Sequence, residues 1–308
     1  MNNIGVIDKQ LLNAISGLTK IPQGAFNIRK DGQAILRRSS PNIYVGPNAE
    51  NNGLLVDIKP GTRNETVHVP VIVTQSGFHD KVYNTFIVGA GADITIIAGC
   101  GIHNESHSDS GHDGIHEIIV KKGARLKYIE KHYGEGKGLG KRILNPTTKI
   151  VLEAGATAEM EMVQIKGVDD TLRKTVADIG DKANLKIVER LMTHGDQKAV
   201  SDIKLNIEGK GASGQVLSRS VARDNSMQVF KAALVGKNEC VGHVECDAIL
   251  MDKARIQSIP ELNAENTEAI LTHEAAIGKI AGEQLVKLMS LGLTEKEAID
   301  VILEGFLK

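Results

Sequence analysis

A cysteine, a histidine and a carboxylate lie close together near the C-terminal end of this sequence. Cys246 lies in a strand-like segment rich in valine and isoleucine, and His273 and Glu274 follow in a second short segment. Thiolate, imidazole and carboxylate groups are the usual protein ligands of iron and zinc. Acidic residues on both sides of Cys246 disfavour a free nucleophilic thiolate and suit a thiol that a bound metal deprotonates. These three residues are therefore the first candidates for a metal site.

Alternation along the strand determines which side chains share a face with Cys246. Cys240 is six residues earlier and falls on the same face if the strand is unbroken, whereas His243 points to the other face. We therefore expect Cys246 to lie inside the fold or at an interface, and His243 is not automatically its partner. Cys240 is a less favoured additional ligand, because a bulge at Gly242 would turn it away.

The densest group of potential ligands lies elsewhere, in a histidine run between residues 103 and 117. Its imidazoles belong to His103, His107, His112 and His116. The intervening serines and glycines make a helix unfavourable, so the i, i+4 spacing that would align two imidazoles is not available. One interpretation is a zinc or iron site, which would support a zinc-dependent enzyme. The other is a solvated connection between two strands, with His116 already in the second strand.

Composition limits the classes of function that this chain can have. The 308 residues contain 37 basic and 38 acidic side chains, and 41% of the residues are hydrophobic. The resulting net charge of −1 gives no general attraction to nucleic acid or to anionic membranes. Aromatic residues make up 3% of the chain and tryptophan is absent, which argues against the stacking platforms of nucleic-acid and carbohydrate binders. We expect neither a nucleic-acid nor a membrane partner.

The three cysteines and the absence of long apolar runs suggest where the protein resides. Three cysteines are too few for a disulfide framework in a chain of this length, so we expect free thiols. No stretch of about 18 apolar residues occurs, and the first residues lack a basic region followed by an apolar run. These features predict a soluble cytoplasmic protein.

The glycine-rich segment from Gly134 to Arg142 superficially suggests a phosphate loop. A Walker loop requires glycine, four residues, and then Gly-Lys-Ser/Thr, whereas Lys141 is followed by Arg142. We therefore interpret the segment as a flexible connection. Any nucleotide chemistry is expected to belong to a partner.

Three segments can be distinguished along the chain. Residues 1–23 include a short amphipathic helix after Asp8, a plausible N-cap. Residues 24–262 alternate with period two and are predicted to be a β core. Residues 263–308 form a predicted C-terminal helical domain, with one helix from Ala275 to a stop at Gly292. A capping box at Thr294 opens a second helix.

The β core repeats a turn followed by alternating apolar residues. The turns that begin at Gly91, Gly123 and Gly155 are 32 residues apart, and similar turns follow at Lys182, Gly211 and Lys253. Loose repetition of this length indicates a β-solenoid, in which each coil buries its apolar row against the next. An antiparallel sandwich with even turn spacing is the alternative.

Several fragments near the C-terminus resemble the C-terminal core of the SufB/SufD family. They occur in the same order and at similar spacing: Cys246-Asp-Ala-Ile-Leu, Asp252-Lys-Ala-Arg, Ile259-Pro-Glu-Leu, Thr272-His-Glu-Ala-Ala-Ile-Gly-Lys-Ile, Glu283-Gln-Leu and Gly292-Leu-Thr. The resemblance covers the β core and both terminal helices and is sharpest over residues 240–308. It points to a minimal, SufB-like branch of the family.

This resemblance implies a right-handed parallel β-helix with helical ends that acts as a non-enzymatic scaffold for iron–sulfur cluster assembly. It implies that the C-terminal helices dock a SufC-like ABC-type ATPase, whose ATP-driven dimerisation remodels the interface between two SufB/SufD subunits. Cys246 matches the proposed cluster ligand of SufB, Glu274 matches its nearby carboxylate, and His273 matches a histidine implicated in SufD. On this view iron and a transient iron–sulfur cluster are bound by residues of two subunits.

The presence of all three matching residues on one chain favours a homodimer, with a SufD-like paralogue as the alternative partner. The chain also departs from the family pattern. No cysteine lies between Cys100 and Cys240, so the sulfur-accepting thiol of longer SufB proteins has no obvious counterpart. The histidine run is not part of the matched pattern.

A β-helix polysaccharide lyase or hydrolase is a further alternative, which the low aromatic content disfavours.

Overall fold

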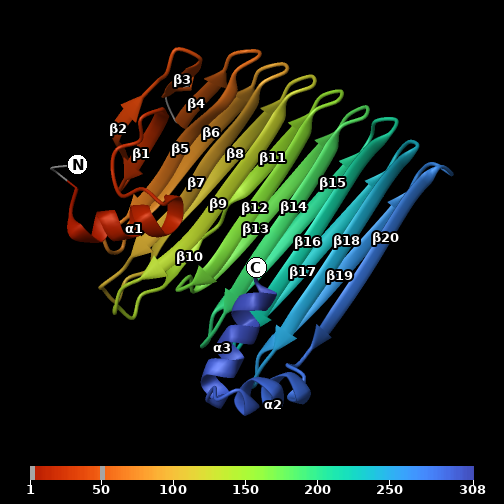
Figure 1. Cartoon of the computed structure of the whole chain (residues 1–308). Coiled ribbons are helices and arrows are strands. Elements are labelled where there is room, and N and C mark those ends of the chain that lie inside the picture. The colour runs from red at the N-terminus through yellow and green to blue at the C-terminus, as the bar shows by residue number, and fades with distance from the viewer. Residues whose placement is uncertain (1–3, 49–52) are drawn as a thin grey trace.

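The chain folds as a parallel β-solenoid built from two facing sheets (Figure 1). The structure is a computed structural model that describes residues 4–48 and 53–308. Successive coils pair in parallel along both sheets, and antiparallel pairs occur only in the hairpins β1–β2 and β3–β4 at the N-terminal end of the described chain. The predicted solenoid with one N-terminal and two C-terminal helices is confirmed, and the antiparallel sandwich is wrong.

The two sheets alternate along the chain, so that each coil contributes one strand to each. Sheet A contains, in spatial order, β2 (Gln33–Arg38), β1 (Ala25–Lys30), β5 (Arg63–Val73), β7 (Asp93–His103), β9 (Arg125–Glu135), β12 (Thr157–Lys166), β14 (Asn184–Thr193), β16 (Ala212–Ala222), β18 (Cys240–Leu250) and β20 (Ala269–Gly278). Sheet B contains β19 (Arg255–Ala264), β17 (Met227–Gly236), β15 (Lys198–Ile207), β13 (Asp170–Ile179), β10 (Arg142–Leu144), β8 (Ser110–Val120), β6 (His79–Val88), β4 (Gly53–Ile58) and β3 (Ile43–Pro47), with β11 (Thr147–Leu152) pairing between β8 and β13.

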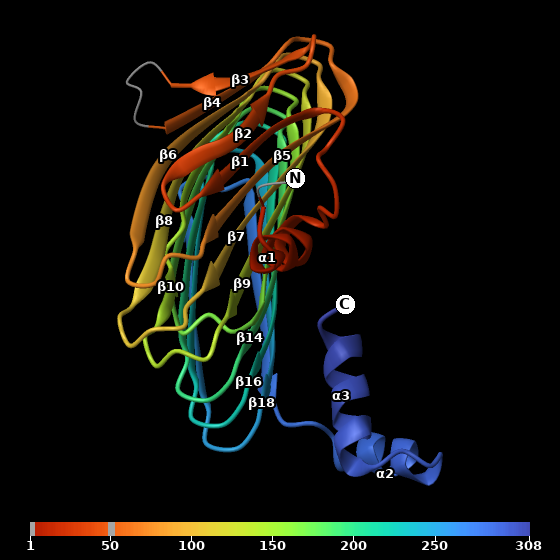
Figure 2. The same cartoon turned by 90° about the vertical axis from the view of Figure 1, so that its left-hand side faces the viewer.

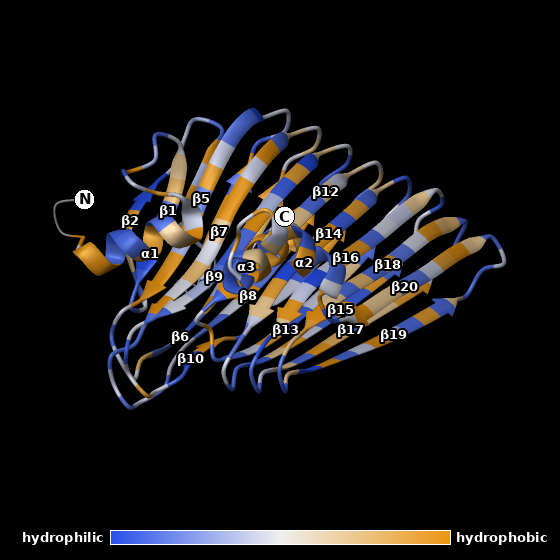
Figure 3. Ribbon diagram, turned by 60° about the horizontal axis from the view of Figure 1, so that its bottom comes forward, coloured by the Kyte–Doolittle hydropathy of each residue, from blue (hydrophilic) through white to orange (hydrophobic). Residues whose placement is uncertain are grey.

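Period-two alternation forms the core because every second side chain points between the sheets. In sheet A the in-register strands stack these side chains into rows, one of which contains Ile96, Tyr128, Met160, Ile187, Val216 and Val244. Bands of alternating hydropathy along the strands show the same pattern (Figure 3). The repeated turns need a left-handed residue, which Gly91 (φ 65°) and Lys182 (φ 52°) provide.

Helix α1 (Val6–Ser16) covers part of the outer face of sheet A (Figure 2). Its N-cap is Gly5, and the Asp8 carboxylate accepts a 2.9 Å hydrogen bond from the Gly5 backbone nitrogen. Asp8 is therefore the third residue of the helix and not the predicted N-cap. A Cβ atom at Gly99 would lie only 2.9 Å from the Ile15 carbonyl oxygen, so this glycine allows the helix to approach the strand closely. The first three residues of the predicted segment 1–23 lie outside the described part of the chain.

The β core extends further toward the C-terminus than the sequence predicts. Strand β20 pairs in parallel with β18 and ends at Gly278, where a helix was expected from Ala275. The run of alanines in this segment favours a helix by propensity, but pairing with β18 overrides it. Helix α2 (Gly282–Ser290) begins four residues after β20 and is followed by Gly292, whose φ of 99° fits the predicted stop.

Helix α3 (Glu295–Phe306) begins with the predicted capping box at Thr294. The Glu297 backbone nitrogen donates to the threonine hydroxyl, and the Glu297 carboxylate accepts from the Thr294 backbone at 2.8 Å. Leu303 of α3 packs with Val221 against the outer face of sheet A. The two helices otherwise stand away from the solenoid (Figure 2).

The C-terminal end of the solenoid is open. Strands β19 and β20 form the last coil, and no strand in the described residues pairs with their outer edges. Leu262 and Ile277 are at inward positions of the last coil, yet each side chain is 42% exposed. This end therefore has both unpaired backbone groups and uncovered core residues.

Candidate functional site in the last coils

Cys246 points into the solenoid one strand before its open end. The side chain is 1% exposed, and its neighbours in the same inward row are Ser218 on β16 and Ala275 on β20. Burial raises the pKa of the Cys246 thiol, and the negative charges of Glu189 and Asp247 raise it further, whereas the Ser258 hydroxyl opposes the shift. The thiol is protonated at neutral pH and requires a cation to become a ligand.

His273 is the predicted partner that the structure brings near Cys246. It lies on β20 opposite Val244, at an inward position, so the two side chains are diagonal neighbours. Such diagonal neighbours lie about 7–8 Å apart, and their Cβ atoms somewhat less. The Nε2 atom of His273 is buried and has no hydrogen-bond partner. An unpaired imidazole nitrogen beside an inward thiol is suited to a metal ion.

Glu274 lies on the opposite face of the same strand. It is exposed and pairs in register with Glu245, which also points outward. Alternation therefore prevents Glu274 and Cys246 of one chain from binding the same ion side by side. Within the described ranges, no three histidine, cysteine or carboxylate side chains form a group that could hold a metal ion.

Cys240 is on the same inward face as Cys246, and β18 runs unbroken between the two. Six residues of strand nevertheless separate them by about 20 Å. The question left open by the sequence is thus answered: Cys240 cannot contribute a second thiolate to a site at Cys246. His243 points outward as expected, and its Nδ1 lies 2.8 Å from the Thr272 hydroxyl.

The histidine run does not form a metal cluster. His107 is exposed in the loop, and His103 lies between Glu105 and Glu135, at 3.1 and 3.3 Å. His112 and His116 belong to β8 and are buried inside the solenoid, where His116 Nδ1 lies 3.2 Å from Asn84 Nδ2. The described side chains of the run form no group of three metal ligands, which argues against the zinc-centre interpretation. The solvated-loop interpretation fits only the first half of the run, because β8 begins earlier than the sequence indicated.

Sequence reasoning missed a band of charged and polar side chains inside the solenoid, all buried except Arg29, whose side chain is 20% exposed. We call it the interior polar band; it consists of Arg29, Asp80, Cys100, His112, Glu130, His132, Arg173 and Glu189. At its N-terminal end Arg29 makes a bidentate ion pair with Asp80, with distances of 2.8 and 2.9 Å. Charged residues at alternate strand positions give the same pattern whether they face inward or outward, so only the pairing shows that they are internal.

The middle of the interior polar band is centred on Glu130. Its carboxylate lies 2.8 Å from His132 Nε2, 3.1 Å from Arg173 Nη1 and 3.0 Å from the Tyr128 hydroxyl. The charges of Arg173 and His132 outweigh the cost of burial and hold the pKa of Glu130 well below its usual range. The carboxylate is therefore ionised inside the fold.

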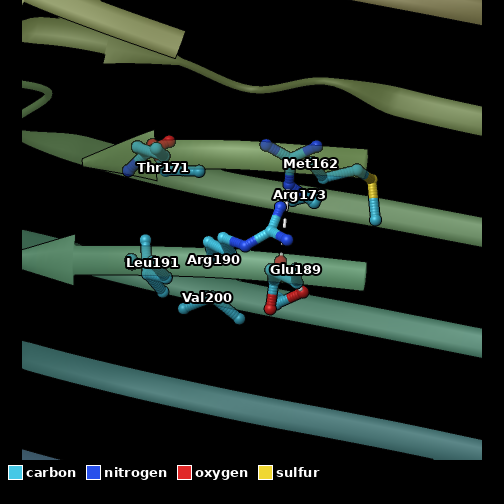
Figure 4. Close-up of a pocket in the computed structure, with 10 residues that line it drawn as sticks. Met162, Thr171, Arg173, Glu189, Arg190, Leu191 and Val200 are labelled. Atoms are coloured by element: carbon cyan, nitrogen blue, oxygen red, sulfur yellow. Dashed lines mark hydrogen bonds and ion pairs between the residues drawn. The ribbon is translucent and has the colours of Figure 1, made fainter. Parts of the chain in front are cut away.

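Glu189 continues the interior polar band toward Cys246. It accepts hydrogen bonds from Ser201 Oγ at 2.7 Å and Ser218 Oγ at 3.3 Å, and it lies 3.6 Å from Arg173 Nε. Figure 4 shows Arg173 directed toward Glu189 at a void of about 10 Å³. A polar void of this size holds about one water molecule. Ser218 is adjacent to Cys246 in the inward row, so the band ends beside the candidate ligand.

A groove is present where the C-terminal helices meet the solenoid. It has a volume of about 500 Å³ and is lined by Ile249, Gln284, Lys287, Leu288, Val301, Ile302, Gly305 and Phe306. Val301 is 49% exposed, and no residue of α2 is buried. The two helices thus present apolar side chains that the described chain leaves uncovered.

No helix among the described residues has the length and hydrophobicity needed to cross a membrane.

Comparison with known proteins agrees with this architecture. Residues 72–306 match the family described as "SUF system FeS cluster assembly, SufBD core domain". The chain belongs to the SufB/SufD family. The match includes most of the solenoid, the open end and both C-terminal helices, and it supports a role in iron–sulfur cluster assembly. The resemblance expected from the C-terminal fragments is therefore confirmed.

Archaeal and bacterial relatives carry the same description. An iron–sulfur cluster assembly SufBD family protein of Methanothermobacter thermautotrophicus is 30% identical over 264 residues, which cover 84% of this chain and 63% of that protein. A relative from Archaeoglobus fulgidus is 27% identical over 277 residues, 89% of this chain and 73% of its own length. A Mycobacterium bovis relative is 28% identical over 239 residues, 75% of this chain but 27% of its own. This SufB/SufD chain thus spans only part of these relatives.

Proposed function

We propose that this protein is a non-enzymatic scaffold on which an iron–sulfur cluster is assembled at the open end of the solenoid. One observation carries the proposal: Cys246 and His273 point inward beside each other at the uncovered end of a SufB/SufD solenoid. Iron and sulfide are the substrates, and the cluster is the cargo. Mixed sulfur, nitrogen and oxygen ligation binds a cluster less firmly than four thiolates, which suits a protein that must release its product.

The second part of the proposal is that two copies meet through their last coils. The open ends of two copies can meet at β19 and β20, and Leu262 and Ile277 would then be covered. Cys246 and Glu274 face opposite sides of one chain, so we assign the carboxylate of each site to the partner copy. A SufD-like paralogue could occupy the same position.

The third part concerns the energy source. A nucleotide-binding loop is absent from the Gly134–Arg142 segment, so ATP hydrolysis would belong to a partner. The apolar groove at α2 and α3 is the surface that we assign to an ABC-type ATPase subunit. ATP-driven movement of two such subunits would shift the last coils and expose Cys246, which is otherwise 1% exposed.

We place this assembly in the reducing cytoplasm, where the three cysteines remain thiols.

A mixed dimer tests whether the ligands come from two copies. One copy carries Cys246→Ser and the other Glu274→Gln, and affinity tags on each copy allow the mixed species to be purified. If each site takes its thiolate and carboxylate from different copies, one of two sites stays intact and the dimer binds about half the wild-type iron. The matched control is a dimer of one wild-type copy with one doubly substituted copy, which leaves no intact shared site. Iron retention only in that control would place both ligands on one chain and refute the shared site.

A further inference from the structure

Cys100 lies in the interior polar band, far from the proposed cluster site. Its side chain is 7% exposed at an inward position of β7, directly opposite His132 on β9. Five strand-to-strand steps along sheet A separate it from β18, a distance of about 24 Å. The imidazoles of His112 and His132 both lower the pKa of this thiol. Neither the fold nor the proposed scaffold role requires this arrangement.

Charged groups from β1, β6, β8, β9 and β13 surround Cys100 and His112. His112 Nδ1 lies 3.3 Å from Asp80, which is itself paired with Arg29, and His132 is paired with Glu130 beside Arg173. Despite burial, the two imidazoles lower the pKa of Cys100 to about 7, and the thiolate together with Asp80 raises the pKa of His112 to about 10. A large part of Cys100 is therefore ionised at neutral pH.

The neighbouring imidazole has unused hydrogen-bonding capacity. His112 is 2% exposed, and neither ring nitrogen has a hydrogen-bond partner of good geometry. An unsatisfied buried donor beside a thiolate is an unusual and costly feature. A hydroxyl oxygen added to the sulfur of Cys100 would give Nε2 of His112 a hydrogen-bond partner.

We propose that Cys100 is a modification site at which the thiolate is oxidised by hydrogen peroxide to a sulfenic acid that His112 stabilises. The sulfur attacks one peroxide oxygen, a sulfur–oxygen bond forms and the oxygen–oxygen bond breaks. The sulfur is oxidised and the peroxide is reduced. The leaving hydroxide takes the Nε2 proton of the His112 imidazolium and departs as water, after which the O–H of the sulfenic acid donates to the freed Nε2 while Nδ1–H stays beside Asp80.

The surroundings suit a small oxidant and a lasting product. Apolar side chains cover the site: Val71, Val73, Ile102, Leu144 and Val168. Peroxide is uncharged and little larger than water, whereas thiol reductants and charged reagents are excluded from such a site. The other two cysteines, Cys240 and Cys246, are both on β18, too far away to form a disulfide with Cys100. The oxidised form therefore has no resolving thiol within the chain.

Peroxide treatment of the iron-free chain, followed by unfolding in the presence of a sulfenate-specific trapping reagent and by peptide mass spectrometry, tests this proposal without reference to cluster assembly. We expect Cys100 to be labelled first, with a rate that rises through a midpoint near pH 7. His112→Gln should slow labelling at pH 7 by about tenfold or more, because the thiol regains a higher pKa. Cys240→Ser is the matched control and should leave the Cys100 rate unchanged.

Three results would overturn the proposal. They are labelling of Cys240 or Cys246 before Cys100, an equal rate in His112→Gln, and a midpoint near pH 9. If His112→Gln does not fold, as judged by circular dichroism, the wild-type order of labelling and its pH midpoint still decide the question. Loss of cluster assembly would have no bearing on this result, since no iron is present.

Discussion

Cys246 and Cys100 show how the same side chain acquires opposite properties inside one solenoid. Burial and the charges of Glu189 and Asp247 raise the pKa of Cys246, whereas two imidazoles lower that of Cys100. The first thiol needs a cation to lose its proton, whereas a large part of the second is ionised at neutral pH without one. At the residue scale, the proposed metal ligand and the proposed reactive thiol therefore differ in their neighbours and not in their burial.

Asp80 provides a test of the interior polar band by pH. Its pKa is held far below the usual value by Arg29 and His112, against the cost of burial. A carboxyl group with a lowered folded pKa stabilises the fold above its unfolded pKa of about 4 and loses that contribution as the pH falls further. Asp80→Asn should lower the free energy of unfolding by about 3 kcal/mol at pH 7.

Urea unfolding at several pH values measures this effect. The difference between wild type and Asp80→Asn should be constant from about pH 5 to 6 and should shrink below about pH 4. Asp109→Asn, on an exposed loop, is the control and should differ little from wild type. A difference that grows with acid would contradict the assignment of an ionised Asp80.

Residue-level prediction from the sequence succeeded where alternation alone decides the answer. Period two correctly placed Cys246 inward and His243 outward, and it placed Cys240 on the face of Cys246. It did not identify Glu130, Arg173 or Glu189 as internal. A charged residue in a strand gives the same alternating sequence pattern whether it faces inward or outward. Apart from Tyr128 and His132, which are each two residues from Glu130, their partners lie 12 to 43 residues away in the chain, on neighbouring coils and across the core.

At the element scale, the helices α2 and α3 are the part of the chain with the least contact to the solenoid. Both were predicted from caps, and the capping box at Thr294 and the stop at Gly292 are present. The start of α2 was predicted seven residues too early, since the alanines before it pair as β20. Local propensity locates a helix end well but does not show that a strand partner is available.

The groove at these helices provides a prediction for the ATPase partner. Val301→Glu places a charge on the apolar wall of the groove. Val301 is 49% exposed, so the fold should tolerate the substitution. We expect affinity for the ABC-type ATPase subunit to fall at least tenfold, measured by isothermal titration calorimetry. Val241→Glu, at a position 50% exposed on the outer face of β18, is the matched control. Equal affinities for both variants would exclude the groove as the docking surface.

At the scale of the whole molecule, the solenoid has one end capped by hairpins and one end open. The β1–β2 and β3–β4 hairpins lie at the N-terminal end, whereas β19 and β20 end the sheets without cover (Figure 1). Repeat spacing was enough to predict a solenoid, because each coil can bury its inward row only against another coil. It could not show which end remains open, since that depends on the pairing of the last strands.

The open end predicts a dimer that charge should disrupt. A double variant, Leu262→Glu with Ile277→Glu, places two carboxylates on the uncovered inward surface of the last coil. Light scattering after size-exclusion chromatography should report a dimer for wild type and a monomer for the variant, because buried like charges would repel across the interface. Val241→Glu should remain dimeric. A double variant that stays dimeric would place the interface elsewhere.

The most direct test of the scaffold is anaerobic reconstitution with iron and sulfide in the presence of the ATPase partner, followed by Mössbauer spectroscopy. The account predicts an iron–sulfur spectrum for wild type and for Cys240→Ser, and its loss in Cys246→Ser. An unchanged spectrum in Cys246→Ser would show that the cluster is assembled elsewhere and would contradict the assignment of the open end as the site.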